Sequence, residues 1–185
     1  MLINVFGAMG SGKTLFLTLI GYCYKQKGYN VFANFKLKFP SKILTLNQLI
    51  DREIPSNTVL LLDEVYTLLE SRLSYSALNI LISHLVFQSR KMNVDIFTTS
   101  QLKRSVDVRL RDIADYNILA EKHKKGFYYF IFFQNEIKTL FLPFENAQKF
   151  YNLYDTTEVV EDYSFKLKRK KLAEKLEEEL KDAAD

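Results

Sequence analysis

Residues 7–14 read Gly7-Ala8-Met9-Gly10-Ser11-Gly12-Lys13-Thr14, and the rest of the chain is organised around them. They match G-x-x-x-x-G-K-[ST], the pattern of the phosphate-binding P-loop. Apolar runs stand on both sides of the loop, at 2–6 and 15–20. This order predicts a strand, a glycine-rich turn and a helix, which is the setting in which the pattern binds phosphate. The alternative is a glycine-rich turn without a ligand, and the strand-then-helix setting argues against it.

Each residue type in the loop has a chemical task. Glycines let the backbone N–H groups of residues 7–12 curl around a triphosphate. Lys13 would bring a cation to the β- and γ-phosphates, and the Thr14 hydroxyl would reach Mg²⁺. The helix that follows adds the positive end of its dipole. We therefore expect residues 7–14 to bind ATP together with Mg²⁺.

The composition is that of one intracellular domain. A chain of 185 residues, of which 48% are hydrophobic, can bury a sheet between helices. Cys23 is the only cysteine, which excludes an internal disulfide and a cysteine-based zinc site, and we expect its thiol to be buried. No run of about 18 apolar residues is present, so we expect a cytoplasmic protein without a transmembrane segment. The net charge of +4 fits a polyanionic partner and ordinary solubility equally well.

Apolar runs alternate with helical patterns through most of the chain. The run 58–62 lacks polar alternation, as expected for a strand buried on both faces of a parallel sheet. Gly28 offers a left-handed cap to the first helix. Strands are predicted at 2–6, 29–35, 58–62, 94–98 and 116–120, and helices at 12–27 and 74–91. The predicted fold is therefore α/β, a mainly parallel sheet flanked by helices with right-handed crossovers.

The pattern changes in the last third of the chain. Residues 126–133 and 137–142 predict an antiparallel hairpin that extends the sheet. The aromatic run in the first of these strands fits a base-stacking platform, but we favour a strand packed between helices, which produces the same run. We expect one ATPase domain over 1–154 and a charged tail or helix over 155–185. That tail is either frayed and solvated or a contact for DNA or another subunit.

Two acidic residues, Asp63 and Glu64, follow the buried run 58–62. Given the P-loop upstream, Asp63 would hold Mg²⁺, and Glu64 would orient and deprotonate the water that attacks the γ-phosphate. Gln101 follows the fourth strand and would sense the γ-phosphate. Asn34, at the end of the second strand, fits either a hydrogen bond to Glu64 or an ordinary turn, and we favour the turn.

No arginine lies near the P-loop in the sequence. A neighbouring subunit would then supply the arginine that stabilises the transition state. Arg109 and Arg111, just before the fifth strand, are predicted catalytic residues of this kind, although either could instead pair with a nearby aspartate at the surface. Arg90 and Arg104 are further candidates.

Taken together, residues 7–14, 59–64, Gln101 and 106–116 resemble the additional-strand, catalytic-glutamate class of P-loop ATPases. Within that class they are most similar to the FtsK–HerA superfamily, which includes small viral genome-packaging ATPases and the Zot-like proteins of filamentous phages. The resemblance covers residues 1–142. It implies a RecA-like sheet with strand order 5-1-4-3-2, a hexameric ring with ATP at each subunit interface, and translocation of double-stranded DNA.

Two departures from these families narrow the hypothesis. Zot-like proteins usually carry a membrane segment and cellular translocases carry extra domains, and we expect neither here. The leading hypothesis is therefore a homo-oligomeric, Mg²⁺-dependent ATPase that packages double-stranded DNA into a viral capsid. One alternative is a Zot-like assembly ATPase that acts on a capsid or other virion protein. A nucleotide kinase is less favoured, because Glu64 indicates transfer of phosphate to water.

Overall fold

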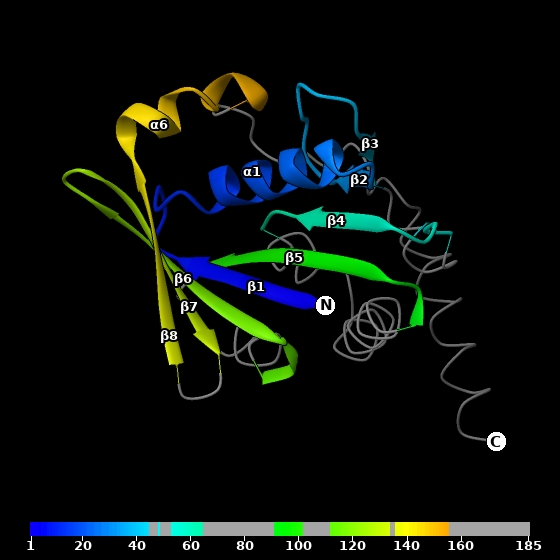
Figure 1. Cartoon of the computed structure of the whole chain (residues 1–185), viewed down its shortest axis with the longest axis horizontal. Helices are drawn as coiled ribbons and strands as arrows, with labels where there is room; N and C mark the ends of the chain where they lie inside the picture. Colours follow the sequence, from blue (N-terminus) through cyan, green and yellow to red (C-terminus); the bar gives the residue numbers. More distant parts are fainter. Residues whose placement is uncertain (45–47, 49–52, 65–90, 102–111, 134–135, 156–185) are drawn as a thin grey trace, which may run out of the picture.

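The computed structural model describes residues 1–44, 48, 53–64, 91–101, 112–133 and 136–155. Its centre is an eight-stranded sheet in the order β3-β2-β4-β5-β1-β6-β7-β8 (Figure 1). The strands are β1 (Leu2–Gly7), β2 (Asn30–Ala33), β3 (Lys42–Ile43), β4 (Thr58–Leu62), β5 (Val94–Gln101), β6 (Tyr116–His123), β7 (Gly126–Phe133) and β8 (Glu136–Pro143). The described helices are α1 (Lys13–Gln26), α6 (Phe144–Gln148) and the short 3-10 helix η1 (Tyr151–Leu153).

The five strands predicted from apolar runs form the parallel part of the sheet. They are β1, β2, β4, β5 and β6, and each pairs in parallel with its neighbours in the order β2-β4-β5-β1-β6. Numbered along the chain, this is the predicted order 5-1-4-3-2, which is confirmed. The short strand β3 was not predicted, and it adds one further parallel partner at the β2 edge.

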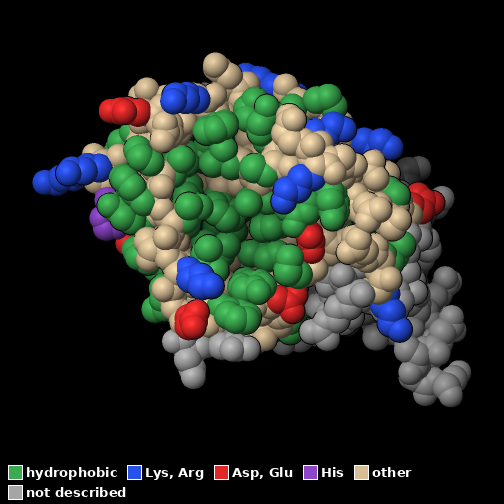
Figure 2. All heavy atoms as spheres, viewed as in Figure 1, with side chains coloured by type: hydrophobic (Ala, Val, Ile, Leu, Met, Phe, Trp, Pro, Cys, Tyr) green, Lys and Arg blue, Asp and Glu red, His purple; other side chains and the backbone are tan. Residues whose placement is uncertain are grey.

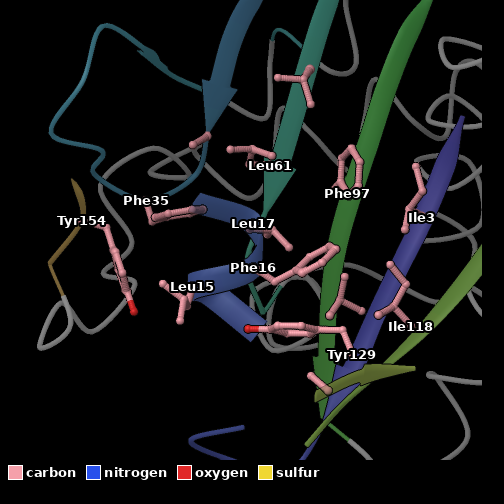
Figure 3. Close-up of a cluster of buried hydrophobic side chains, with 14 of the residues drawn as sticks. Ile3, Leu15, Phe16, Leu17, Phe35, Leu61, Phe97, Ile118, Tyr129 and Tyr154 are labelled. Atoms are coloured by element: carbon pink, nitrogen blue, oxygen red, sulfur yellow. The ribbon is translucent and has the colours of Figure 1, made fainter. Parts of the chain in front are cut away.

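Helix α1 covers one face of the parallel strands. It packs against β1, β2, β4 and β5, and its side chains Leu15, Phe16 and Leu17 are buried. Figure 3 shows Phe16 and Leu17 on the side of the sheet residues Phe97 and Leu61, and Leu15 on the side of Tyr154. The helix ends as predicted, because Gly28 takes a left-handed φ of 84° and its N–H donates to the Lys25 carbonyl. The P-loop is thereby anchored to a hydrophobic core that α1 shares with the sheet.

Strands β6, β7 and β8 form an antiparallel meander at the other edge of the sheet. The predicted hairpin is confirmed as β7 and β8, and β6 continues past its predicted end to His123. The expectation that the aromatic strand is packed between helices is wrong for its second half. Phe127 and Tyr129 are buried, but Phe132 and Phe133 are 37% and 36% exposed. The reason is the position of β7 in the sheet, because α1 packs mainly on β1, β5, β4 and β2, which lie on the other side of β6.

Several sequence predictions concern residues outside the described ranges. They are the helix at 74–91 apart from Lys91, the four candidate arginines, and the charged tail apart from Asp155. The domain boundary near 154 therefore stays a prediction. The expectation of a buried thiol is wrong, because Cys23 is exposed on α1. Within the described part of the chain, no helix is both long enough and apolar enough to cross a bilayer.

Candidate nucleotide-binding site

The P-loop lies at the edge of the sheet where the parallel strands end. Strand β1 ends at Gly7 and α1 begins at Lys13, so the residues between them form the connection. In the register of the sheet Gly7 stands opposite Gln101 of β5 on one side and Ala120 of β6 on the other. Ligands of open α/β sheets bind outside this edge. The topology therefore brings the loop and the predicted Gln101 together.

Two glycines of the loop adopt conformations that other residues avoid. Gly10 and Gly12 have φ values of 73° and 91°. Gly7 is constrained by space instead, because a Cβ built there would lie 2.3 Å from the Ala120 carbonyl oxygen and 2.7 Å from Ser11 Oγ. The glycines of the pattern are therefore needed for the shape of this loop.

Two donors of the loop face inward and fit a phosphate group. Lys13 Nζ is buried and donates to the carbonyls of Gly7 at 3.1 Å and Ala8 at 2.9 Å. Burial lowers the pKa of Lys13, although the nearby Asp63 and Glu64 carboxylates oppose this shift. Ser11 Oγ is buried without a hydrogen-bond partner among the described residues. An ammonium and an unpaired hydroxyl inside one loop match the acceptor oxygens of phosphate.

Asp63 joins the loop to two strands. The Thr14 hydroxyl donates to its Oδ2 at 2.8 Å, and the Thr99 hydroxyl donates to its Oδ1 at 2.6 Å. Burial raises the pKa of Asp63, while these two hydrogen bonds work in the opposite direction. A hydroxyl and a carboxylate in direct contact are hard oxygen ligands of the kind that Mg²⁺ prefers. The residues present therefore fit the metal as well as the nucleotide.

Glu64 follows Asp63 in a strained backbone conformation. Its φ is 47°, in the left-handed region that glutamate rarely adopts. The neighbouring contacts hold it there. Asn34 donates from Nδ2 to the Asp63 carbonyl at 2.8 Å and accepts the Asp63 N–H at 2.7 Å, while the Glu64 N–H donates to Thr99 Oγ1 at 2.7 Å. Asn34 lies in a bend after β2, as the favoured turn reading expects. Its side-chain amide binds the backbone of Asp63 rather than the Glu64 side chain, and this contact was not predicted.

The structure joins four predicted site residues, Thr14, Asp63, Glu64 and Gln101, through hydrogen bonds that include Thr99. Gln101 Nε2 donates to Glu64 Oε1 at 3.1 Å, so the sheet edge carries a continuous set of contacts from Thr14 through Asp63 to Gln101. Thr99 was missed as a site residue. Strand alternation could have found it, because residues two apart in β5 face the same side and Gln101 was already a candidate. The candidate arginines 90, 104, 109 and 111 lie outside the described residues.

Comparison with solved structures identifies this architecture. The N-terminal domain of zonular occludens toxin from Neisseria meningitidis matches with a TM-score of 0.57 at 17% identity, over 83% of this chain and 98% of that one. The chain has the P-loop ATPase fold. The ATPase domain of G40P matches with a TM-score of 0.56 at 13% identity, over 82% of this chain and 84% of that one. The flagellar accessory protein FlaH from Methanocaldococcus jannaschii matches with a TM-score of 0.55 at 15% identity, over 77% of this chain and 79% of that one.

The sequence alone gives no comparable match. No protein-family model matches the chain, and no curated protein matches it either. The identities to the three solved structures are low, so the likeness establishes the fold. The predicted resemblance to Zot-like P-loop ATPases is confirmed at that level.

Proposed function

We propose that the protein is a Mg²⁺-dependent ATP hydrolase. The observation that carries the proposal is Glu64, which is placed beside the P-loop by the contacts of Asn34, Thr99 and Gln101. ATP bound with Mg²⁺ would supply a γ-phosphoryl group that can pass to water once the water is oriented and the developing charge is stabilised. The residues of this site divide those two tasks between them.

Stabilisation of charge falls to the loop. Backbone N–H groups at the start of α1 and the Lys13 ammonium are the donors available to the phosphates. Thr14 and Asp63 would hold Mg²⁺. Lys13 is the cationic side chain in these contacts. An arginine from a neighbouring copy, with Arg109 and Arg111 as first candidates, would complete the site in a ring, which we propose is hexameric.

Orientation of water falls to Glu64. A carboxylate adjacent to the metal-binding aspartate can accept a proton from an attacking water. A kinase transfers the phosphoryl group to its acceptor substrate and needs no activated water. The hydrogen bond from Gln101 occupies Glu64 Oε1 in this structure. Hydrolysis would then require that the carboxylate turn to the water, and Gln101 would link this turn to the state of the γ-phosphate.

We further propose that the hydrolase acts on double-stranded DNA, as a packaging motor would. The supporting observation is the turn between β6 and β7, which carries exposed Lys122, Lys124 and Lys125. Because β6 runs parallel to β1 and continues past Ala120, the partner of Gly7, this turn lies at the same edge as the nucleotide site. A cationic turn at this edge could bind phosphates of the DNA backbone.

The second candidate is an assembly ATPase with a protein cargo, such as a capsid protein. The observation that favours it is the apolar surface of β7 and β8. Phe132, Ile137 and Phe141 share one face of these strands and are 37%, 63% and 40% exposed. Figure 2 shows hydrophobic side chains gathered over the region in which Figure 1 draws β1 and β6 to β8. Exposed apolar patches often mark protein contacts.

Phosphate release from ATP, with and without double-stranded DNA, separates these functions. A motor hydrolyses Mg²⁺-ATP faster when DNA is added, and its DNA affinity falls steeply with salt. Hydrolysis that ignores DNA, without salt-sensitive DNA binding, rejects the motor and leaves the ATPase. Under those conditions, retention of a capsid protein by the pure ATPase supports the assembly function. Transfer of phosphate to a nucleoside rather than to water would identify a kinase.

A further inference from the structure

Tyr129 connects the antiparallel meander to the P-loop. Its hydroxyl donates to the Gly12 carbonyl at 3.0 Å, across 117 residues of sequence. The side chain is fully buried, and its ring packs against Phe16 with the centroids 4.7 Å apart. Figure 3 shows Tyr129 reaching from the sheet to the first turns of α1, beside Phe16. Burial raises the pKa of Tyr129 well above its ordinary value, so the hydroxyl stays a donor at neutral pH.

These contacts clamp the first turn of α1 at both ends. The Gly12 carbonyl accepts the Phe16 N–H at 2.9 Å as well as the Tyr129 hydroxyl. Phe127 and Tyr129 pack closely against Gly12, because a Cβ built on Gly12 would lie 2.6 Å from Phe127 Cδ1 and 3.0 Å from the Tyr129 oxygen. Two aromatic residues of β7 therefore fix where Gly12 sits and which way its carbonyl points.

The direction of that carbonyl decides the direction of a phosphate donor. The Gly12 carbonyl and the Lys13 N–H belong to one planar peptide unit, and in a trans peptide they point in opposite directions. The described residues contain no cis peptide bond. When Tyr129 holds the carbonyl toward β7, the Lys13 N–H is turned away from β7, toward the opening of the loop. This N–H is among the unpaired donors of the helix start that bind phosphate.

We propose that Tyr129 is a positioning residue of the nucleotide site, which orients the Lys13 peptide for phosphate through its hydrogen bond to Gly12. The inference rests on the proposed binding of ATP. It also gives the meander a task in the site, since the residue that holds the loop comes from β7. Tyr129 itself touches neither phosphate nor metal in this assignment.

The test compares Tyr129→Phe with Tyr128→Phe in the full-length protein. The first variant keeps the ring against Phe16 and removes only the hydroxyl. The second removes a hydroxyl from the preceding residue of β7, whose ring packs on Phe141 on the other face of the sheet. Affinity for Mg²⁺-ATP is measured with a fluorescent ATP analogue in buffer where both variants are folded. Amide hydrogen exchange is measured without nucleotide, at Phe16 and at Ser11, whose N–H donates to the Ala8 carbonyl at 3.2 Å.

Tyr129→Phe is expected to weaken ATP binding about threefold to tenfold, the usual cost of one lost hydrogen bond. Exchange at Phe16 should quicken by a similar factor, while Tyr128→Phe changes neither quantity. A Tyr129→Phe protein with wild-type ATP affinity overturns the inference, even if its unfolding temperature falls, because a purely structural tyrosine predicts that result. If the wild-type protein binds no ATP, the proposed function fails. The exchange measurement still tests the positioning of the loop, because exchange at Phe16 and Ser11 in Tyr129→Phe that equals the wild-type exchange rejects it.

Discussion

Gln101 and Glu64 are joined by a hydrogen bond from Nε2 to Oε1 of 3.1 Å, although they lie at the ends of two different strands. Strand β5 places Gln101 opposite Gly7, the first residue of the P-loop. The pair therefore connects the residue proposed to activate water with the loop proposed to hold the phosphates. Replacement of either partner should separate nucleotide binding from turnover.

Gln101→Ala is expected to leave ATP affinity within about twofold and to lower turnover about tenfold to a hundredfold, the range for a hydrogen bond that Gln101 would make to the charged γ-phosphate once Glu64 has turned to the water. Gln101→Glu should lower turnover further, because it places a second carboxylate against Glu64. Steady-state phosphate release and equilibrium binding of an ATP analogue measure the two effects. Unaltered turnover in both variants would remove Gln101 from the site.

Asn34→Ala should destabilise the fold and slow hydrolysis together. The substitution leaves the buried N–H and carbonyl of Asp63 without the partners that hold them at 2.7 Å and 2.8 Å. The expected loss is about 1–3 kcal/mol in the free energy of unfolding. Denaturant titration measures it, and Asn30→Ala is the control because Asn30 is an exposed residue of β2, the strand that precedes Asn34. Equal stability of the two variants would contradict the role given to Asn34.

The double variant Lys124→Glu and Lys125→Glu tests the DNA contact. If the turn grips two backbone phosphates, the slope of log affinity against log salt should fall by about 2, since each phosphate contributes about 0.9. Lys25→Glu with Lys27→Glu makes the same charge change at the far end of α1 and should have the smaller effect. Filter binding over a range of salt concentrations measures both slopes, and identical slopes would place the DNA elsewhere.

The raised pKa of Tyr154 leads us to expect a loss of stability at alkaline pH. Burial, with smaller contributions from Tyr151 and Asp63, raises the pKa of Tyr154 from 10.0 to about 12. Between those values the unfolded chain has lost a proton that the folded chain keeps, so ionisation favours unfolding. The stability is therefore fully present below about pH 10 and falls as the pH rises toward 12. In Tyr154→Phe the free energy of unfolding should fall less steeply over this interval, with the same pH dependence as wild type near pH 7.

The parallel part of the sheet could be predicted from the sequence because its signals are local. The P-loop is one contiguous pattern, and 58–62 is an unbroken apolar run that ends in two acids. Carboxyl ends of parallel strands meet at one edge, which is why Asp63, Glu64 and Gln101 could be expected together. These predictions needed the order of the strands but no detail of side-chain packing.

The contacts that were missed depend on geometry that no local pattern contains. Asn34 binds the Asp63 backbone, and this requires the register of β2 against β4. Tyr129 reaches Gly12 only because the register of β7 on β6 turns Tyr129 toward α1 and Tyr128 away from it. The exposure of Phe132 follows from the place of β7 near the sheet edge. Long-range register, rather than residue type, set the limit of what could be predicted.

We propose that Glu64 activates the water for hydrolysis in this P-loop site, and the decisive measurement is the rate of phosphate release from saturating Mg²⁺-ATP. Wild type should turn over, and Glu64→Gln should be slower by about a hundredfold to ten-thousandfold while it still binds and traps ATP, the range for loss of a general base. Lys13→Ala should instead lose binding. Turnover by Glu64→Gln at the wild-type rate, or loss of ATP binding equal to that of Lys13→Ala, would contradict the account.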